Sequence, residues 1–181
     1  FIRGAQSQGI ATTVKHFVGN DAEFERMTIN SVIDQRTLRE VYLLPFELAV
    51  REGGSLGIMT SYNRMNGVYC AENRELLQDI LRDEWGFEGF VVTDWFAGFS
   101  TEGAAHAGLD LEMPAPPRGY GKFLAEAVKD MGDLGMEDDH INEILTSPPK
   151  KTGSEDQVDT FAELDAMLSD ADKELNELLN S

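Results

Sequence analysis

The stretch Gly89-Phe90-Val91-Val92-Thr93-Asp94-Trp95 decides how this chain of 181 residues is expected to fold. An apolar, β-branched run without alternation is typical of a strand buried on both faces, as in a parallel sheet. The run ends in a carboxylate followed by an indole. Two interpretations of Asp94 remain open on this stretch alone, because Asp is a favoured helix N-cap and also suits the catalytic end of a barrel strand.

Three further runs have the same form, each a short β-rich segment that ends in polar or aromatic residues, and they cover residues 12–17, 56–63 and 108–113. Helical patterns separate the runs, over residues 37–50, 72–85 and 100–107, and another follows near residues 122–131. Alternation of this kind predicts an α/β fold with right-handed crossovers. The parallel strands are expected near residues 12–16, 57–61, 89–93 and 109–112.

The carboxyl ends of parallel strands meet at one edge of a sheet, so the groups at these ends are expected to lie together. The groups are Lys15, His16, Tyr62 and Asp94. Each has an ordinary structural interpretation: His16 as a core histidine, Lys15 as a surface side chain, and Tyr62 as a packing aromatic with a hydrated hydroxyl. Their joint occurrence at successive strand ends favours a functional site.

Five segments in order carry a likeness to a known family, and they cover residues 14–17, 34–47, 58–67, 84–95 and 107–114. This series closely resembles the N-terminal barrel of glycoside hydrolase family 3, the β-glucosidase and exo-glucanase group. The likeness extends over roughly residues 1–130. It implies a partial (β/α)8 TIM barrel with about four βα units, followed by a C-terminal helical tail.

The resemblance also implies a reaction, the hydrolysis of terminal β-linked sugars by a retaining mechanism. Asp94 matches the family's nucleophile, a carboxylate that forms a covalent glycosyl-enzyme. A neighbouring Lys15 ammonium would help to keep Asp94 ionised, and Tyr62 would hydrogen-bond it. Contacts with the sugar are implied for Lys15, His16, Met59, Tyr62 and Trp95, the last as an aromatic wall.

The same resemblance implies that several parts of the family's enzyme are missing from these residues. A complete barrel needs about 250 residues, so the chain is interpreted as the second half of a barrel, either a fragment or the product of a broken gene. The family's upstream acid and arginine that grip the sugar have no counterpart, and neither does the general acid/base glutamate of its second domain. A catalytically silent half-barrel or carbohydrate-binding remnant is therefore the alternative.

The expected organisation is a partial barrel over residues 1–146, a linker over 147–153 and an acidic amphipathic helix over 154–181. Before the linker, residues 136–145 have the pattern of a further helix. The last segment contains nine acids against one base, Lys173, around an apolar stripe of helical period. A terminal helix docked on the barrel is the favoured interpretation, and a short coiled-coil or partner-binding helix is the other.

The composition excludes several function classes. A net charge of −18 and a pI near 4.4 argue against binding to nucleic acid or to an anionic membrane surface. A single cysteine, Cys70, excludes an intrachain disulfide, and the three histidines have no metal-binding spacing. No cofactor is expected, because the family uses none. The expected partners are a carbohydrate substrate and, through open barrel edges, other copies of the chain.

Overall fold

The computed structural model describes residues 1–133. Three segments predicted from the sequence lie outside the described residues: the helix expected over residues 136–145, the linker over 147–153 and the acidic helix over 154–181. The structure therefore tests the predictions made for the α/β part of the chain.

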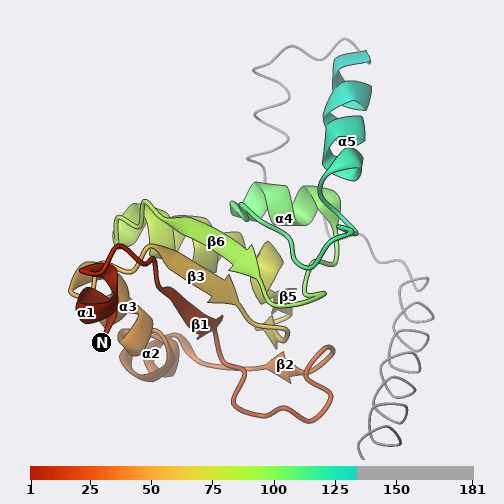
Figure 1. The fold of residues 1–181 in the computed structure, drawn as a ribbon. Coiled ribbons are helices and arrows are strands. Elements are labelled where there is room, and N and C mark those ends of the chain that lie inside the picture. The colour runs from red at the N-terminus through yellow and green to blue at the C-terminus, as the bar shows by residue number, and fades with distance from the viewer. Residues whose placement is uncertain (134–181) are drawn as a thin grey trace, which may run out of the picture. The chain divides into compact units, whose positions relative to one another are not determined.

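Three parallel strands form the central sheet: β1 (Thr13–Phe17), β3 (Gly57–Thr60) and β6 (Phe90–Thr93). β3 lies in the middle and pairs with both neighbours, as Figure 1 shows. Ile58 is in register with Val14 on one side and with Val91 on the other. The predicted α/β fold with a parallel sheet is confirmed for this part, and the carboxyl ends of all three strands lie at the same edge.

The fourth expected strand, near residues 109–112, is reduced to one parallel bridge between Val92 and Leu111. A side chain explains why the pairing is so short. The Asp110 carboxylate accepts the backbone N–H of Val91 at 2.7 Å and also contacts Arg82 at 2.6 Å. It thereby takes a donor that a longer backbone ladder would use.

A second, smaller sheet lies beyond the carboxyl ends of the central strands and was not predicted. It contains β2 (Asn30–Ser31), β4 (Arg64–Met65) and β5 (Val68–Tyr69). β4 and β5 form an antiparallel hairpin around Asn66 and Gly67, which both have positive φ. Asn-Gly is the favoured pair for such a two-residue turn, so the sequence contained a signal for this hairpin.

The helical segments begin and end at local signals. Asp34 accepts the backbone N–H of Thr37 at 3.0 Å, and Asn73 accepts that of Leu76 at 3.2 Å, as N-capping side chains do. The helix expected over residues 37–50 is divided, because Pro45 lacks an N–H and starts a new first turn. The segments are α1 (Ile2–Gln6), α2 (Gln35–Thr37), η1 (Leu38–Tyr42), α3 (Leu44–Arg51), η2 (Cys70–Glu72), η3 (Glu75–Glu84), α4 (Thr101–Ala107) and α5 (Lys122–Asp133).

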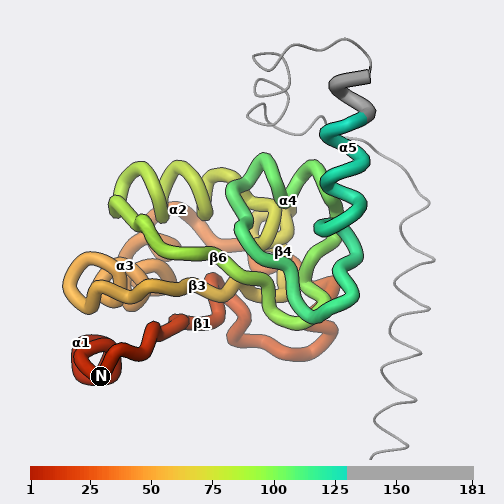
Figure 2. Tube along the Cα trace, turned by 45° about the horizontal axis from the view of Figure 1, so that its top comes forward, coloured from red at the N-terminus to blue at the C-terminus, as the bar shows by residue number. Residues whose placement is uncertain are grey.

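One face of the sheet packs against helices and forms the apolar core. Ile58 and Val91 are fully buried there, and the ring of Phe17 makes edge contacts with Phe46 at 5.0 Å and Trp85 at 6.1 Å between ring centroids. Figure 2 shows β1, β3 and β6 side by side, with the helical segments before and after β6 on the same side of that strand. The helical side of the core is supplied by Leu38, Leu76, Leu77, Ile80 and Leu81.

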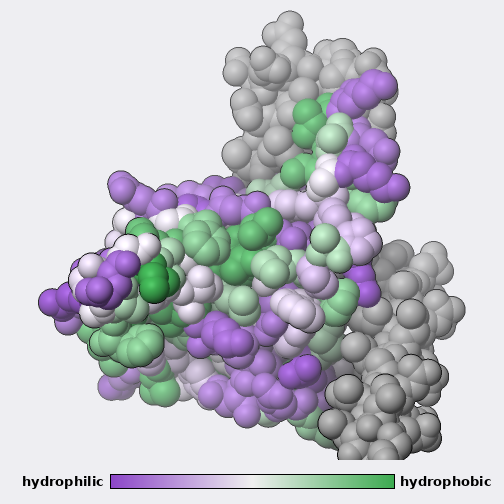
Figure 3. Space-filling view, viewed as in Figure 1, coloured by the Kyte–Doolittle hydropathy of each residue, from purple (hydrophilic) through white to green (hydrophobic). Residues whose placement is uncertain are grey.

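The other face of the sheet carries apolar side chains that are partly accessible to solvent. Met59 and Val92 are register partners on it; Met59 is half-buried and Val92 is buried, while Phe90 and Leu111 flank them with exposed fractions of 38% and 47%. Figure 3 shows apolar surface over this region, which we call the open face. No helix among residues 1–133 is long and apolar enough to cross a membrane.

We expect the chain to self-associate through the open face and through the edge of β1 that has no strand partner within residues 1–133, because exposed apolar surface and free strand edges favour association. Leu111→Lys should shift sedimentation-velocity profiles towards the monomer, since it places a charge on this face. Val41→Lys is the matched control, because Val41 is also exposed but lies on η1. A wild-type chain that stays monomeric at high micromolar concentration would contradict this expectation.

Candidate active site

Asp94 follows β6 directly and is held by backbone contacts. Its N–H donates to the carbonyl of Thr60 on β3 at 3.3 Å, and its carboxylate Oδ1 accepts the N–H of Trp95 at 2.7 Å. No helix starts at this point, because α4 begins at Thr101 with Ser100 as its N-cap residue. The helix-capping interpretation of Asp94 is therefore wrong, and its carboxylate is available at the carboxyl end of the strand.

His16 at the end of β1 contacts the second carboxylate oxygen, with Nε2 3.0 Å from Oδ2 of Asp94. Burial lowers the pKa of His16 below its usual value, and the Asp94 charge opposes this effect while Lys15 adds to it. A lowered pKa favours the neutral ring near pH 7. The acceptor opposite Nε2 then selects the tautomer in which Nε2–H donates to the carboxylate.

Tyr62, two residues beyond β3, is the third group at this position and is only 7% exposed. Burial, the Asp94 charge and a hydrogen bond to the Asp94 carboxylate raise the pKa of Tyr62 to about 12. The Tyr62 hydroxyl therefore remains a proton donor throughout the neutral range. The end of each central strand thus contributes one group, and the three groups are His16, Tyr62 and Asp94.

Arg26 is a further charged residue at this site that the sequence did not single out. Its guanidinium lies 4.8 Å from the centre of the Tyr62 ring, a cation–π geometry, and it pairs with Glu23 at 3.2 Å. The charges of both residues act on His16 and on Tyr62. Arg26 comes from the irregular segment after β1, where no periodicity marks it.

The remaining expected site residues lie around this group with different environments. Lys15 on β1 is exposed, and within residues 1–133 the side chain in ion-pair contact with Asp94 is His16 rather than Lys15. Met59 is half-buried beside Val92 on the open face. The Trp95 indole is 56% exposed, so most of its surface can receive a ligand.

Asn63 fixes the position of Tyr62 and was also missed. Its fully buried side-chain amide nitrogen, which carries two hydrogens, lies within hydrogen-bond distance of three acceptors: the carbonyl of Val18 at 3.2 Å, Ser31 Oγ at 3.3 Å and the carbonyl of Arg64 at 3.1 Å. It therefore joins the segments that follow β1 and β3 to β2. Its contacts with Val18 and Ser31 join residues far apart in the sequence, so no local pattern marked Asn63.

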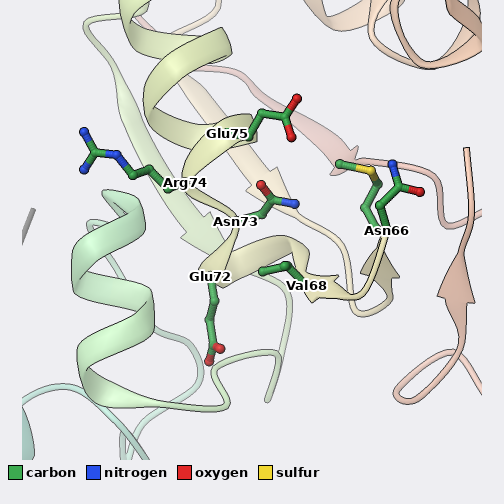
Figure 4. A pocket seen from close by; sticks show the side chains of 7 residues that line it. Asn66, Val68, Glu72, Asn73, Arg74 and Glu75 are labelled. Atoms are coloured by element: carbon green, nitrogen blue, oxygen red, sulfur yellow. The ribbon is translucent and has the colours of Figure 1, made fainter. Parts of the chain in front are cut away.

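A pocket of about 220 Å³ lies elsewhere, between the β4–β5 hairpin and the start of η3. In Figure 4 its polar side chains point apart: Glu72 towards the loop before α4, and Arg74 and Glu75 in other directions. Such a set does not converge on a ligand. Within residues 1–133, moreover, no three His, Cys, Asp or Glu side chains are grouped so that they could hold a metal ion.

The fold and this group of residues define an α/β protein whose carboxylate, imidazole and phenol meet at the carboxyl ends of parallel strands. Residues 1–146 match the glycosyl hydrolase family 3 N terminal domain. The chain therefore belongs to glycosyl hydrolase family 3.

Named relatives agree with this assignment. A β-glucosidase of Rhizobium radiobacter is 54% identical over 130 residues, which are 72% of this chain and 16% of that protein. The crystal structure of a Kluyveromyces marxianus β-glucosidase in complex with glucose is similar with a TM-score of 0.70 and 41% identity, over 80% of this chain and 18% of that one. The structure of β-glucosidase 3B from Thermotoga neapolitana in complex with glucose is similar with a TM-score of 0.68 and 37% identity, over 82% of this chain and 21% of that one. The chain spans about 15–16% of the length of the curated relatives.

The contacts of His16 predict opposite pKa changes in two variants. Asp94→Asn should lower the pKa of His16 further, because it removes the charge that raises it, and Lys15→Gln should raise it. NMR titration of the imidazole Cε1–H resonance measures both, with Glu88→Gln as an exposed control. The lowered pKa also links His16 to stability, because the folded chain binds the imidazole proton more weakly than the unfolded chain does. The neutral His16 therefore favours folding above pH 6.5, and this contribution to the free energy of unfolding is lost as the pH falls. Equal values in all variants would contradict the described contacts.

Proposed function

We propose that the protein is a β-glucosidase-like glycoside hydrolase that cleaves terminal β-linked sugars with retention of configuration. The observation that carries this proposal is the position of Asp94, whose carboxylate meets His16 and Tyr62 at the carboxyl ends of the strands in a glycosyl hydrolase family 3 chain. The relatives named β-glucosidase and the neighbours solved with glucose support the choice of substrate.

In this proposal Asp94 is the nucleophile. Its carboxylate attacks the anomeric carbon, the bond to the leaving oxygen breaks, and a covalent glycosyl-enzyme forms; water then hydrolyses this ester. The N–H of Trp95 and the Nε2 of His16 contact different oxygens of Asp94 and fix its rotamer. A carboxylate offers about four lone-pair sites, so these contacts leave an oxygen lone pair for the sugar.

The neighbouring side chains bind the sugar in the same proposal. Lys15 on β1 donates to hydroxyl groups, and His16, whose Nε2–H donates to Asp94, accepts a hydroxyl proton at Nδ1. Such contacts can strengthen in the transition state. Tyr62 and Met59 line the pocket, while the exposed indole of Trp95 provides an aromatic wall. The tyrosine hydroxyl remains protonated, as its raised pKa indicates, and it therefore serves as a donor.

The proposed activity belongs to a complete protein in which the strands form part of a (β/α)8 barrel. A retaining enzyme also needs a carboxylic acid about 5–5.5 Å from the nucleophile to protonate the leaving oxygen. We infer that this acid/base glutamate lies outside these residues. The alternative is a catalytically silent half-barrel or carbohydrate-binding remnant, and the accessible open face favours it for the chain on its own.

Substitution of Asp94 tests the proposed nucleophile in a complete enzyme that carries this chain. Asp94→Ala should lower kcat for aryl β-glucosides by about 10⁴-fold or more, a loss typical of removing a covalent nucleophile. Glu88→Gln, an exposed substitution before β6, should leave it unchanged. Mass spectrometry after reaction with an activated 2-fluoro-glucoside should find the sugar on the peptide that contains Asp94. Retained turnover in Asp94→Ala would remove this residue from the mechanism.

The isolated chain of 181 residues should show little or no turnover of disaccharides, because protonation of a sugar leaving group requires the missing acid. Nitrophenyl glucosides need little protonation, so residual glycosylation is expected with these substrates only. Parallel assays with cellobiose and nitrophenyl glucoside measure the difference. Steady hydrolysis of cellobiose by the isolated chain would mean that it supplies its own acid.

A further inference from the structure

Glu112 is a buried carboxylate that receives three backbone hydrogen bonds. It is 8% exposed and lies directly before Met113 in the segment after the Leu111 bridge. Its Oε1 accepts the N–H of Arg118 at 2.8 Å, and its Oε2 accepts the N–H groups of Gly119 and Tyr120 at 2.9 and 2.7 Å. Three charge-assisted bonds to backbone fix residues 118–120, which have no regular secondary structure of their own.

The segment that follows the proposed nucleophile rests directly on this carboxylate. A Cβ added at Gly98 would lie 3.0 Å from Oε1 of Glu112, and its three nearest neighbours would all be atoms of that side chain. A side chain at position 98 would therefore require Glu112 to shift by a few tenths of an ångström, and no unusual backbone angle adds to the restriction.

Residues that Glu112 organises hold the same segment from the side. The guanidinium of Arg118 lies 4.6 Å from the centre of the Phe96 ring, and the N–H of Phe96 donates to the carbonyl of Met113 at 2.9 Å. The hydroxyl of Tyr120 donates to the carbonyl of Leu109 at 2.7 Å, and this bond joins the two ends of the loop over residues 109–120. The turn from Phe96 to Gly98 thus lies against a loop whose conformation depends on Glu112.

We infer that Glu112 is a positioning residue for Asp94 and Trp95, and this inference rests on the proposed glycosidase function. Glu112 acts through Gly98, Phe96 and Arg118, and it touches neither the substrate nor Asp94. Both of its oxygens accept backbone N–H groups, so it is not the acid that protonates the leaving oxygen. Its effect is on the orientation of the nucleophile, because the chain immediately after Asp94 is held against it.

A positioning role predicts a larger loss in kcat than in substrate binding. Glu112→Gln keeps the shape but turns an amide NH₂ towards backbone donors, which breaks at least one of the three bonds. A displacement of about 1 Å at a reacting group can cost on the order of 100-fold in rate. We expect kcat for nitrophenyl glucoside to fall roughly 10- to 100-fold. KM should change less than kcat, because Lys15 and His16 are held on β1, and Trp95 is the proposed sugar contact that lies on the displaced segment.

The experiment combines kinetics in a complete enzyme that carries this chain with amide hydrogen exchange in the 181-residue chain. Glu112→Gln is compared with Glu88→Gln, which changes an exposed acid by the same atom. Exchange at the N–H of Phe96 and Gly119 should become at least 10-fold faster in Glu112→Gln only, at a temperature where both chains are folded by circular dichroism. These amides report the position of the loop whether or not the chain has activity.

A double-mutant cycle separates positioning from general destabilisation. Gly98→Ala should lower kcat by itself, because the new methyl group displaces Glu112. In a Glu112→Ala background it should have no further effect, since the atoms that it would meet are gone. Additive losses in kcat, or unchanged exchange at Phe96 in Glu112→Gln, would overturn the inference.

Failure of the inference and failure of the proposed function give different results. An active wild-type enzyme whose kcat is unaffected by Glu112→Gln would refute the positioning role and leave the glycosidase proposal intact. A wild-type enzyme without glycosidase activity would refute the proposed function. It would refute the positioning role as well, although faster exchange at Phe96 would still establish that Glu112 holds the loop.

Discussion

The pairing of β3 with both of its neighbours is the constraint on which the other described features depend. The carbonyl of Thr60 accepts the N–H of Asp94, and the N–H of Ser61 donates to the carbonyl of Phe17. The end of β3 therefore fixes where β1 and β6 end relative to one another along the sheet. Because all three strands run in parallel, their polar ends face one another, and an imidazole, a phenol and a carboxylate meet without any long connection between them.

The central strands could be predicted from the sequence because their signals are local. Each is a short β-rich run that ends at polar residues, and Phe90 to Thr93 is buried on both faces except at its first residue. The proximity of His16, Tyr62 and Asp94 follows from the rule that parallel strands share their carboxyl edge. Residues at strand ends are thus accessible to sequence reasoning once the strands are known. Their chemical roles come from the family likeness rather than from the pattern.

Other features depend on contacts between distant segments and could not be predicted. The strand near residue 110 is short because the Asp110 side chain accepts the backbone N–H of Val91. The pattern of apolar residues does not indicate this contact. Arg26 contacts the Tyr62 ring from an irregular segment. Glu112 accepts backbone N–H groups from residues 118–120 and so holds a loop that has no regular secondary structure. Asn63 stands in the same group, since two of its acceptors, on Val18 and Ser31, lie far from it in the sequence. Only the Asn66-Gly67 hairpin had a clear local signal that was overlooked.

The dependence of the Asp94 segment on Glu112 and Tyr120 has a consequence for the order in which the chain acquires its structure during synthesis. β1, β3 and β6 can pair as soon as Thr93 has left the ribosome, but the turn after Asp94 has nothing to rest on until residue 120 has also emerged. A nascent chain of intermediate length therefore has a formed sheet and an unsupported Asp94 segment. Translational pauses between these two points would prolong a state in which apolar strands are paired and their polar ends are still unorganised.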